Sequence, residues 1–403
     1  MISTNYINEA KCSSIKEGPN VNLHITTPAA LLALSLMYLK SNDKELAGRV
    51  TIPNSFNTIE ECNPTHILLK TVAKNLIMWE AMDPTQEFVF GQVPELIRFV
   101  YENPLGRVYE RYYLVYNVSE IDYQTITSIY LSVITGALMA MALKYAGTGH
   151  TGVVRLIKDH IEHLRSVKIT KCEFANDPLN KNTIDQYELF SLLSTSLLSL
   201  SVVMAGTCDT DSLRVARVVR KKFQDSKVFH YGFFMAVNMA IGFIFLGYGN
   251  YTFNREDMSV AALLLALYPV FPNTPGDNRW HLQALRHFYV LAMEEKIFHT
   301  VDVDTNKVVN VAARMTFKVD GEYQSEDLQT PVLLQESKRL THIKIIDEDY
   351  FDVDFSFEGI AADPKAIYIK RKHFKDINPK ALNPENALNT EISQAQTRKT
   401  LQL

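Results

Sequence analysis

The sequence predicts a mainly α-helical chain, built from repeated helical units and followed by a small β-rich domain. An eight-residue, helix-like segment occurs four times with small residues at matching places. Polar turn residues follow each copy and lead into a second helical stretch. Beyond Lys296 the apolar residues take on the alternating spacing that is typical of strands. Repeated helical pairs indicate a stacked array of units rather than one ordinary core.

Each copy carries small residues at its first and third positions, which lie about 200° apart around a helix axis. Neighbouring helices can therefore approach closely on both sides, and these segments are expected to be inner helices. Three copies end in glycine, and we expect Gly147, Gly206 and Gly247 to be structural turn residues that supply positive φ at helix C-termini. The copies occupy residues 33–40, 140–147, 199–206 and 240–247.

Local signals place the other helical elements in order. Thr27 and Pro28 predict a helix start, with threonine as the cap and proline at the first helical position. The acidic segment 209–212 predicts the start of a helix that ends in the basic segment 220–222. The first two copies begin at 33 and 140, whereas the last two begin at 199 and 240. The long first interval is therefore expected to contain a further, degenerate unit or an insertion.

The sequence divides into four predicted regions. Residues 23–298 form a helical repeat domain with loop insertions, among them the polar stretches 102–106 and 176–182. Residues 299–373 form a small β-rich domain with a turn at Gly321. Flexible segments are expected at residues 1–22 and 374–403. The predicted strands cover 308–317, 341–346, 350–357 and 366–370.

The composition is that of a folded, soluble chain, with 47% hydrophobic and 21% charged residues among 403. A net charge of −4 gives no electrostatic case for nucleic acid. The four cysteines lack CxxC spacing, which favours reduced thiols in the cytosol or nucleus. The first 22 residues have no apolar core of a signal peptide.

A multi-span membrane protein remains an alternative. Four segments carry no Asp, Glu, Lys or Arg and approach the length that spans a bilayer. Their serines, their prolines and the lack of flanking aromatic belts argue against this reading. Helices enclosed on all sides by protein would show the same composition. The segments are 123–143, 189–208, 228–254 and 258–276.

Residues 147–152 match the G-x-G-x-x-G pattern of dinucleotide-binding proteins. A true fingerprint follows a β-strand and opens a helix, because the pyrophosphate must meet the helix N-terminus across a tight turn. The preceding stretch, 136–146, is Ala- and Met-rich and helical in character. We therefore interpret these glycines as repeat turns and predict no cofactor.

The sequence offers weak signals for metal sites and none for catalysis. His160 and His163, beside carboxylates, could form half of a metal site, but no third ligand follows, so a solvated helix face is the preferred interpretation. His281 and His287 are interpreted as polar groups satisfied between helices or as partner contacts. No nucleophile elbow, Cys–His pair or paired carboxylate is found. We predict a protein that is not an enzyme.

Two groups of basic residues are the candidate partner-binding positions. Arg214, Arg217 and Lys221 lie at i, i+3 and i+7, a stripe that is either a solvated face or a partner surface. Arg279 and Arg286 are the second choice because they belong to an apolar helix.

Several segments resemble the largest scaffold subunit of the anaphase-promoting complex, or cyclosome. The similarity covers roughly residues 21–372, and long segments agree in order and type. The short repeat itself is also found in the two large non-ATPase base subunits of the proteasome regulatory particle, whose scaffold role is a further alternative. The matching segments are 24–43, 68–79 with 84–85, 230–251, 278–292 and 301–305.

The resemblance implies a proteasome/cyclosome (PC) repeat solenoid that closes into an α-toroid, followed by a small β-rich domain. It implies a non-catalytic scaffold of a cell-cycle ubiquitin ligase, in the nucleus and cytoplasm. The implied partners are cullin-like, RING, Doc-domain and tetratricopeptide-repeat subunits and a WD-repeat coactivator. The large N-terminal part of the family, including a β-propeller, has no counterpart in this sequence.

Overall fold

The computed structural model divides the chain into two compact units, residues 1–295 and 296–403. We call them the helical unit and the β unit. The segments 1–22 and 374–403 lie outside the described residues, as do most of the predicted loops at 102–106 and 176–182. The structure describes residues 23–60, 62, 64–103, 122–170, 182–224, 230–274, 276–319, 321–334, 339–357 and 365–372.

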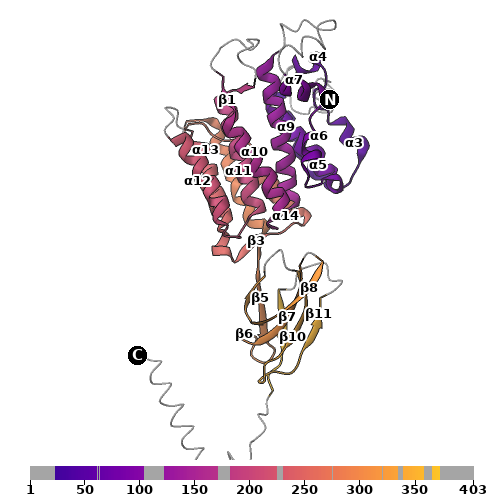
Figure 1. Cartoon of the computed structure of the whole chain (residues 1–403), viewed down its shortest axis with the longest axis vertical. Coiled ribbons are helices and arrows are strands. Elements are labelled where there is room, and N and C mark those ends of the chain that lie inside the picture. Colours follow the sequence, from indigo (N-terminus) through magenta and orange to yellow (C-terminus); the bar gives the residue numbers. More distant parts are fainter. Residues whose placement is uncertain are drawn as a thin grey trace, which may run out of the picture. The chain divides into compact units, whose positions relative to one another are not determined.

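The described part of the helical unit contains a row of long inner helices, each packed on the next, and Figure 1 shows much of this row. A shorter helix follows each inner helix along the chain, which confirms the predicted helix–turn–helix unit. The inner helices are α2 (Leu23–Met37), α5 (Pro64–Ile77), α9 (Tyr123–Lys144), α11 (Gln186–Val203) and α13 (Tyr231–Ile244). The helices that follow them are α3 (Lys44–Arg49), α6 (Gln86–Gly91), α10 (Thr151–Ser166), α12 (Thr210–Gln224) and α14 (Asp257–Ala266).

The pair α5 and α6 lies between the first two sequence copies and confirms the expected degenerate unit. Two short helices, α4 (Phe56–Glu60) and α7 (Glu95–Glu102), flank this pair, and η1 (Trp79–Ala81) lies inside it. The short strands β1 (Lys168–Ile169) and β2 (Thr183–Ile184) precede α11. After α13 come η4 (Leu246–Gly249) and β3 (Tyr251–Phe253); after α14 come η5 (Asn278–Ala292) and β4 (Met293–Glu295).

Helix α9 is enclosed by its neighbours, as its small residues predict. Ala140 and Ala142 on its two sides are both fully buried. A β-carbon at Gly136 would lie 2.6 Å from the carbonyl oxygen of Leu68, so only glycine lets α5 approach this closely. At the ends of the row, by contrast, Ala33 of α2 and Gly242 of α13 are exposed. One side of each terminal inner helix is therefore open.

The burial of α9 also bears on the membrane alternative. Within the described residues, two helical stretches have the length and hydropathy of a span, Tyr123–Lys144 and Tyr231–Gly249. The apolar window of the first is 100% buried, and that of the second is 50% buried. Contact with other helices is thus sufficient to explain why α9 lacks charge. The predicted segments 189–208 and 258–276 do not form such stretches.

One predicted helix start is wrong and another is confirmed. Helix α2 begins at Leu23, so Pro28 lies inside it. The hydroxyl of Thr27, predicted to cap the helix, is buried and has no hydrogen-bond partner among the residues that the structure describes. In contrast, Asp209 caps α12, because its carboxylate accepts a 2.8 Å hydrogen bond from the Ser212 N–H.

The β unit contains two small sheets. The first has the strand order β11 (Asp354–Ser356), β10 (Arg339–Ile345), β7 (Ala312–Val319) and β8 (Glu322–Gln329). The second has the order β12 (Ala366–Ile369), β5 (Ile297–Asp302) and β6 (Lys307–Val309), with β9 (Val332–Leu333) also paired to β5. The core of the β unit includes Phe298, Met315 and Ile343, all fully buried. A mainly α chain with a β-rich C-terminal region is therefore confirmed.

Candidate functional site

The turns that follow the inner helices link one helix–turn–helix repeat to the next repeat. Gly206 donates its N–H to the Phe243 carbonyl at 2.9 Å, and Cys208 donates to the Ile244 carbonyl at 3.0 Å. Both acceptors lie at the C-terminal end of α13, where helix carbonyls lack partners within the helix. Each turn of this kind thus caps the next inner helix. The same paired bonds join Lys40 to Leu76, Asn42 to Ile77, Gly147 to Val202 and Gly149 to Val203.

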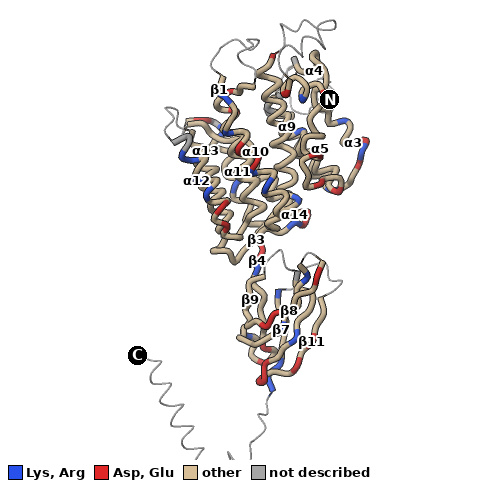
Figure 2. The backbone as a smooth tube through the Cα atoms, viewed as in Figure 1, with Lys and Arg blue, Asp and Glu red and all other residues tan. Residues whose placement is uncertain are grey.

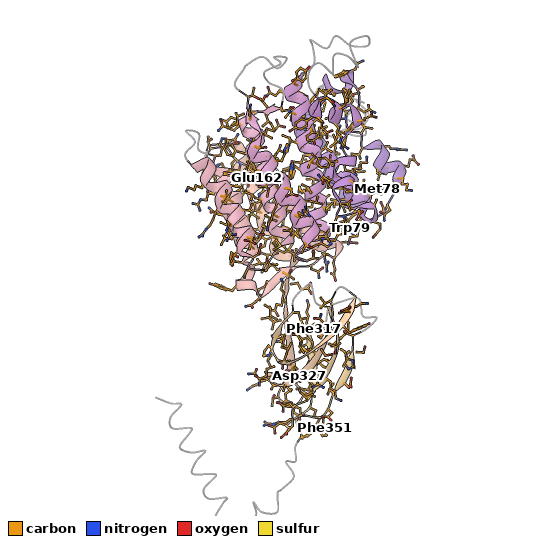
Figure 3. All side chains as sticks on the ribbon, viewed as in Figure 1. Met78, Trp79, Glu162, Phe317, Asp327 and Phe351 are labelled. Atoms are coloured by element: carbon orange, nitrogen blue, oxygen red, sulfur yellow. The ribbon has the colours of Figure 1, made fainter. Side chains whose placement is uncertain are left out.

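These bonds require left-handed backbone at two alternate positions in each turn. Gly147 and Gly206 have φ values of 70° and 66°, and Gly247 has 54°. Positive φ at these three glycines confirms the conformation predicted for them. In the turn of the degenerate unit, a side chain supplies the link instead, because Lys144 Nζ of α9 donates to the carbonyls of Trp79 and Met82 at 2.8 and 3.0 Å (Figure 3 labels Trp79).

The G-x-G-x-x-G segment is part of this linkage. It follows helix α9 rather than a strand, as expected. The N–H groups of Gly147 and Gly149 are already donated to carbonyls of α11, at 2.8 and 2.9 Å. Those N–H groups would have to point at a pyrophosphate in a dinucleotide site. Two donors that a dinucleotide site would direct at the phosphates are therefore already used within the protein.

The paired histidines of α10 do not converge on a common ligand. His160 is buried against Thr135, with 2.8 Å between its Nε2 and the threonine hydroxyl, and burial lowers its pKa to about 3. The Nε2 atom of His163 lies 3.0 Å from the Tyr101 hydroxyl. The solvated face predicted here is thus wrong for His160. No group of three or more potential metal ligands occurs in the described part of the chain.

The basic stripe lies on the exposed face of α12. Arg214, Arg217 and Lys221 are all exposed, and Arg214 forms an ion pair of 2.5 Å with Asp211. Figure 2 shows Lys and Arg along α12, whereas the neighbouring inner helices carry few charges. The stripe is therefore available to a partner, and its role as a contact remains a prediction.

Arg279 and Arg286 have different environments in η5. Arg279 is half-exposed, 3.7 Å from Asp277. Arg286 is only 6% exposed, and its guanidinium donates to the carbonyls of Ala266 and Val270 at 2.8 and 2.9 Å. The expected partner surface is therefore wrong for Arg286, which joins η5 to the end of α14. His281 and His287 are both exposed, so neither is buried between helices, and their role as partner contacts stays a prediction.

Sequence reasoning missed a cavity of about 580 Å³ inside the helical unit. Residues of α2, α5, α9, α11, α13 and the segment after α14 line it. Its polar lining includes Asp185 and Glu188 at the start of α11, Ser194 further along α11, and His230 immediately before α13. The sequence signal was a carboxylate, Glu188, at the start of an otherwise uncharged apolar helix.

Glu188 is a carboxyl group of this lining with a strongly raised pKa. Its side chain accepts a hydrogen bond from the Ser128 hydroxyl of α9. Burial raises its pKa to about 7, the hydrogen bond from Ser128 opposes this shift, and the nearby charge of Asp185 adds to it. No Lys or Arg in the described residues forms an ion pair with Glu188.

The comparison with known proteins finds a family match that spans the helical unit. The sequence profile of the APC1 fifth domain matches residues 2–294. The chain belongs to this family. APC1 fifth-domain relatives include anaphase-promoting complex subunit 1 of Mus musculus, 33% identical over 377 residues, which cover 88% of this chain and 18% of the mouse protein.

Two further relatives of this APC1 fifth-domain chain come from distant organisms. Anaphase-promoting complex subunit 1 of Arabidopsis thaliana is 33% identical over 345 residues, covering 84% of this chain and 20% of the plant protein. The negative regulator of mitosis of Emericella nidulans is 29% identical over 353 residues, covering 86% and 16%. The chain thus spans about a fifth of the length of these relatives.

Proposed function

We propose that this chain is a non-catalytic scaffold element of an anaphase-promoting complex, the ubiquitin ligase of the cell cycle, in the nucleus and cytoplasm. The observation that carries the proposal is the similarity to anaphase-promoting complex subunit 1, which extends over 88% of this chain for the mouse relative. The proposed partners are cullin-like, RING, Doc-domain and tetratricopeptide-repeat subunits and a WD-repeat coactivator.

The geometry is suited to a scaffold. Each inner helix is tied to its neighbour by packing, and several junctions are reinforced by the paired turn bonds described above. A linked row of this kind resists bending and holds its outer helices at fixed spacing. Partners bound to those helices would be held at high effective concentration relative to one another, without any catalytic residue.

The proposed scaffold curves toward the closed α-toroid of PC-repeat proteins. Contacts between the first and last helix–turn–helix repeats support this curvature. Lys40, in the turn after α2, lies 2.7 Å from Asp257 and donates to the Arg255 carbonyl at 3.1 Å. A charge swap tests the contact: Lys40→Asp should lower the melting temperature of the helical unit, and adding Asp257→Lys should restore part of the loss. An unchanged melting temperature in every variant would count against closure through this contact.

Affinity purification of the tagged full chain from dividing cells, followed by mass spectrometry, tests the scaffold role. We expect cullin-like, RING and Doc-domain proteins to be recovered together. A matched control is the tagged β unit alone, residues 296–403, checked for folding by circular dichroism. Recovery of no ligase subunit by the folded full chain would refute the proposal.

The basic stripe can be tested in the same purification. The double variant Arg214→Glu, Arg217→Glu should keep its circular dichroism spectrum, because exposed substitutions seldom change stability by more than about 0.5 kcal/mol. If the stripe is an interface, at least one ligase subunit should be lost. Retention of every subunit would assign the stripe to solvent and leave the scaffold role intact. The matched control is Arg155→Glu on the exposed face of α10.

A further inference from the structure

The cavity in the helical unit has the size of a binding site rather than of a packing defect. Its volume of about 580 Å³ falls within the range of roughly 300 to 1,000 Å³ that is typical of ligand pockets. Residues of five inner helices line its wall, together with the proline-rich segment 268–273. Most of the lining residues belong to helices, so the cavity is already present in the folded chain.

Two carboxyl groups face this space without a cation of their own. Asp185 caps α11 through the N–H groups of Tyr187 and Glu188, at 2.8 and 3.3 Å. Glu188 is bonded to Ser128, a neutral group. The one arginine among the lining residues, Arg279, already lies beside Asp277. Within the described residues, neither carboxyl group forms an ion pair with Lys or Arg, so this wall can accept a cation.

A second observation, independent of the carboxyl groups, indicates a missing polar partner. His230 is 3% exposed, and its Nε2 atom has no hydrogen-bond partner within the described part of the chain. Ser194 is 0% exposed, and its hydroxyl likewise has none there. Both residues line the cavity. Because a buried polar atom without a hydrogen-bond partner destabilises the fold, a ligand that bonds to these atoms would recover free energy.

The rest of the wall is aromatic and apolar. The ring of Phe190 packs against that of His230 with 4.0 Å between centroids, and the Phe233 ring centroid lies 4.9 Å from that of Phe190. Tyr268 and Phe271 stand in the same lining. Aromatic faces attract cations, and they also accommodate the methylene groups of a long side chain. An anion would be repelled by the carboxyl groups, and a wholly apolar ligand would leave His230 and Ser194 unsatisfied.

We propose that this cavity is a binding site for the side chain of a lysine or arginine presented by a partner protein. The ammonium or guanidinium group donates to Glu188 and to His230 Nε2, and the alkyl stem lies against the aromatic wall. The source of the side chain rests on the proposed scaffold function. The binding test uses peptides alone and is independent of that function.

The test measures saturation-transfer NMR from the full chain to short peptides. Acetyl-Gly-Arg-Gly-amide and acetyl-Gly-Lys-Gly-amide should show transfer, whereas the citrulline and norleucine peptides, which are similar in shape but neutral, should not. Glu188→Gln should weaken binding about tenfold or more, because it removes the charge that accepts the bond. His230→Phe, which keeps the ring packing, should also weaken binding.

The control variant is Glu162→Gln, which removes a carboxylate from the exposed face of α10, where Figure 3 labels the residue. It should bind the peptides as the unchanged chain does. Circular dichroism confirms the fold of each variant. Equal binding of the arginine and citrulline peptides, or undiminished binding by folded Glu188→Gln, would overturn the proposal. Absence of binding by every peptide would overturn it too, while recovery of ligase subunits by the full chain would leave the scaffold function standing.

Discussion

A β-carbon at position 206 would lie 1.8 Å from the carbonyl oxygen of Tyr251. Gly206 is therefore held at this turn by two independent constraints. Its φ of 66° strains any other L-residue, and the backbone of β3 passes where a side chain would begin. The same residue donates the bond that caps α13. The conformation of this turn, the bond that caps α13 and the close approach of β3 thus all depend on glycine at position 206.

Replacing Gly206 with valine should destabilise the helical unit by at least about 2 kcal/mol, because positive φ alone costs roughly 1 to 2 kcal/mol and the clash adds to it. Thermal unfolding followed by circular dichroism measures the loss. Gly242→Ala is the matched control, since this helical glycine is exposed and nothing lies within 4 Å of the added carbon. It should leave stability unchanged or raise it by up to about 1 kcal/mol. Equal effects of the two substitutions would contradict this account.

Helix periodicity and turn chemistry made the helical unit predictable. The small residues around Ala140 indicate which sides of the helix lie close to neighbouring helices. The glycines that follow inner helices indicate where the turns lie. The pair α5 and α6 could be expected only from spacing, because its turn uses Trp79 and Lys144 in place of glycine. The helix start at Leu23 escaped prediction because a Thr–Pro signal lies inside α2 rather than at its beginning.

Two other features could not be read from local pattern. Strand β8 has almost no apolar residue, since it lies at the edge of its sheet and pairs only with β7 among the described strands. The candidate cavity depends on residues more than forty positions apart along the chain, such as Glu188 and His230, and only the packing of α11 beside α13 brings them to one space. The sequence indicates the polar residues but not their convergence.

Arg286 should contribute to stability rather than to partner binding. Arg286→Met removes the guanidinium donor to the Ala266 carbonyl and one of the two donors to the Val270 carbonyl, the other being Gln283. It also removes the guanidinium that lies 4.6 Å from the Phe271 ring centroid. We expect a loss of about 2 to 4 kcal/mol in unfolding free energy. Arg279→Met, at the exposed end of the same segment, should cost less than about 1 kcal/mol. Urea unfolding of both variants compares them, and similar losses would refute the distinction.

Glu188 should make the stability of the helical unit depend on pH. Burial raises its pKa from 4.5 to about 7, so between these values the folded chain holds the proton more tightly than the unfolded chain. Its contribution to stability is therefore fully present below pH 4.5 and is lost as the pH rises through 7. Glu188→Gln cannot ionise and removes this dependence.

The measurement is the difference in urea midpoint between Glu188→Gln and the unchanged chain, from acidic to mildly alkaline pH. The urea midpoint of the variant should rise relative to that of the unchanged chain as the pH rises. Other titrating groups near this carboxyl, such as Asp185 and His230, are present in both proteins and largely cancel. Glu162→Gln, measured in parallel, should show no such trend. A difference that is constant over the whole range would contradict the raised pKa.

Neither NAD nor ATP is expected to bind at residues 147–152. A phosphate would need the N–H groups of Gly147 and Gly149, and releasing them would uncap α11 at Val202 and Val203. Because the two bonds also tie α9 to α11, nucleotide binding would compete with the packing of the inner row. Isothermal titration calorimetry should detect no saturable heat with either nucleotide. Saturable binding that disappears in Gly149→Ala, with the circular dichroism spectrum unchanged, would show that this turn can release its donors.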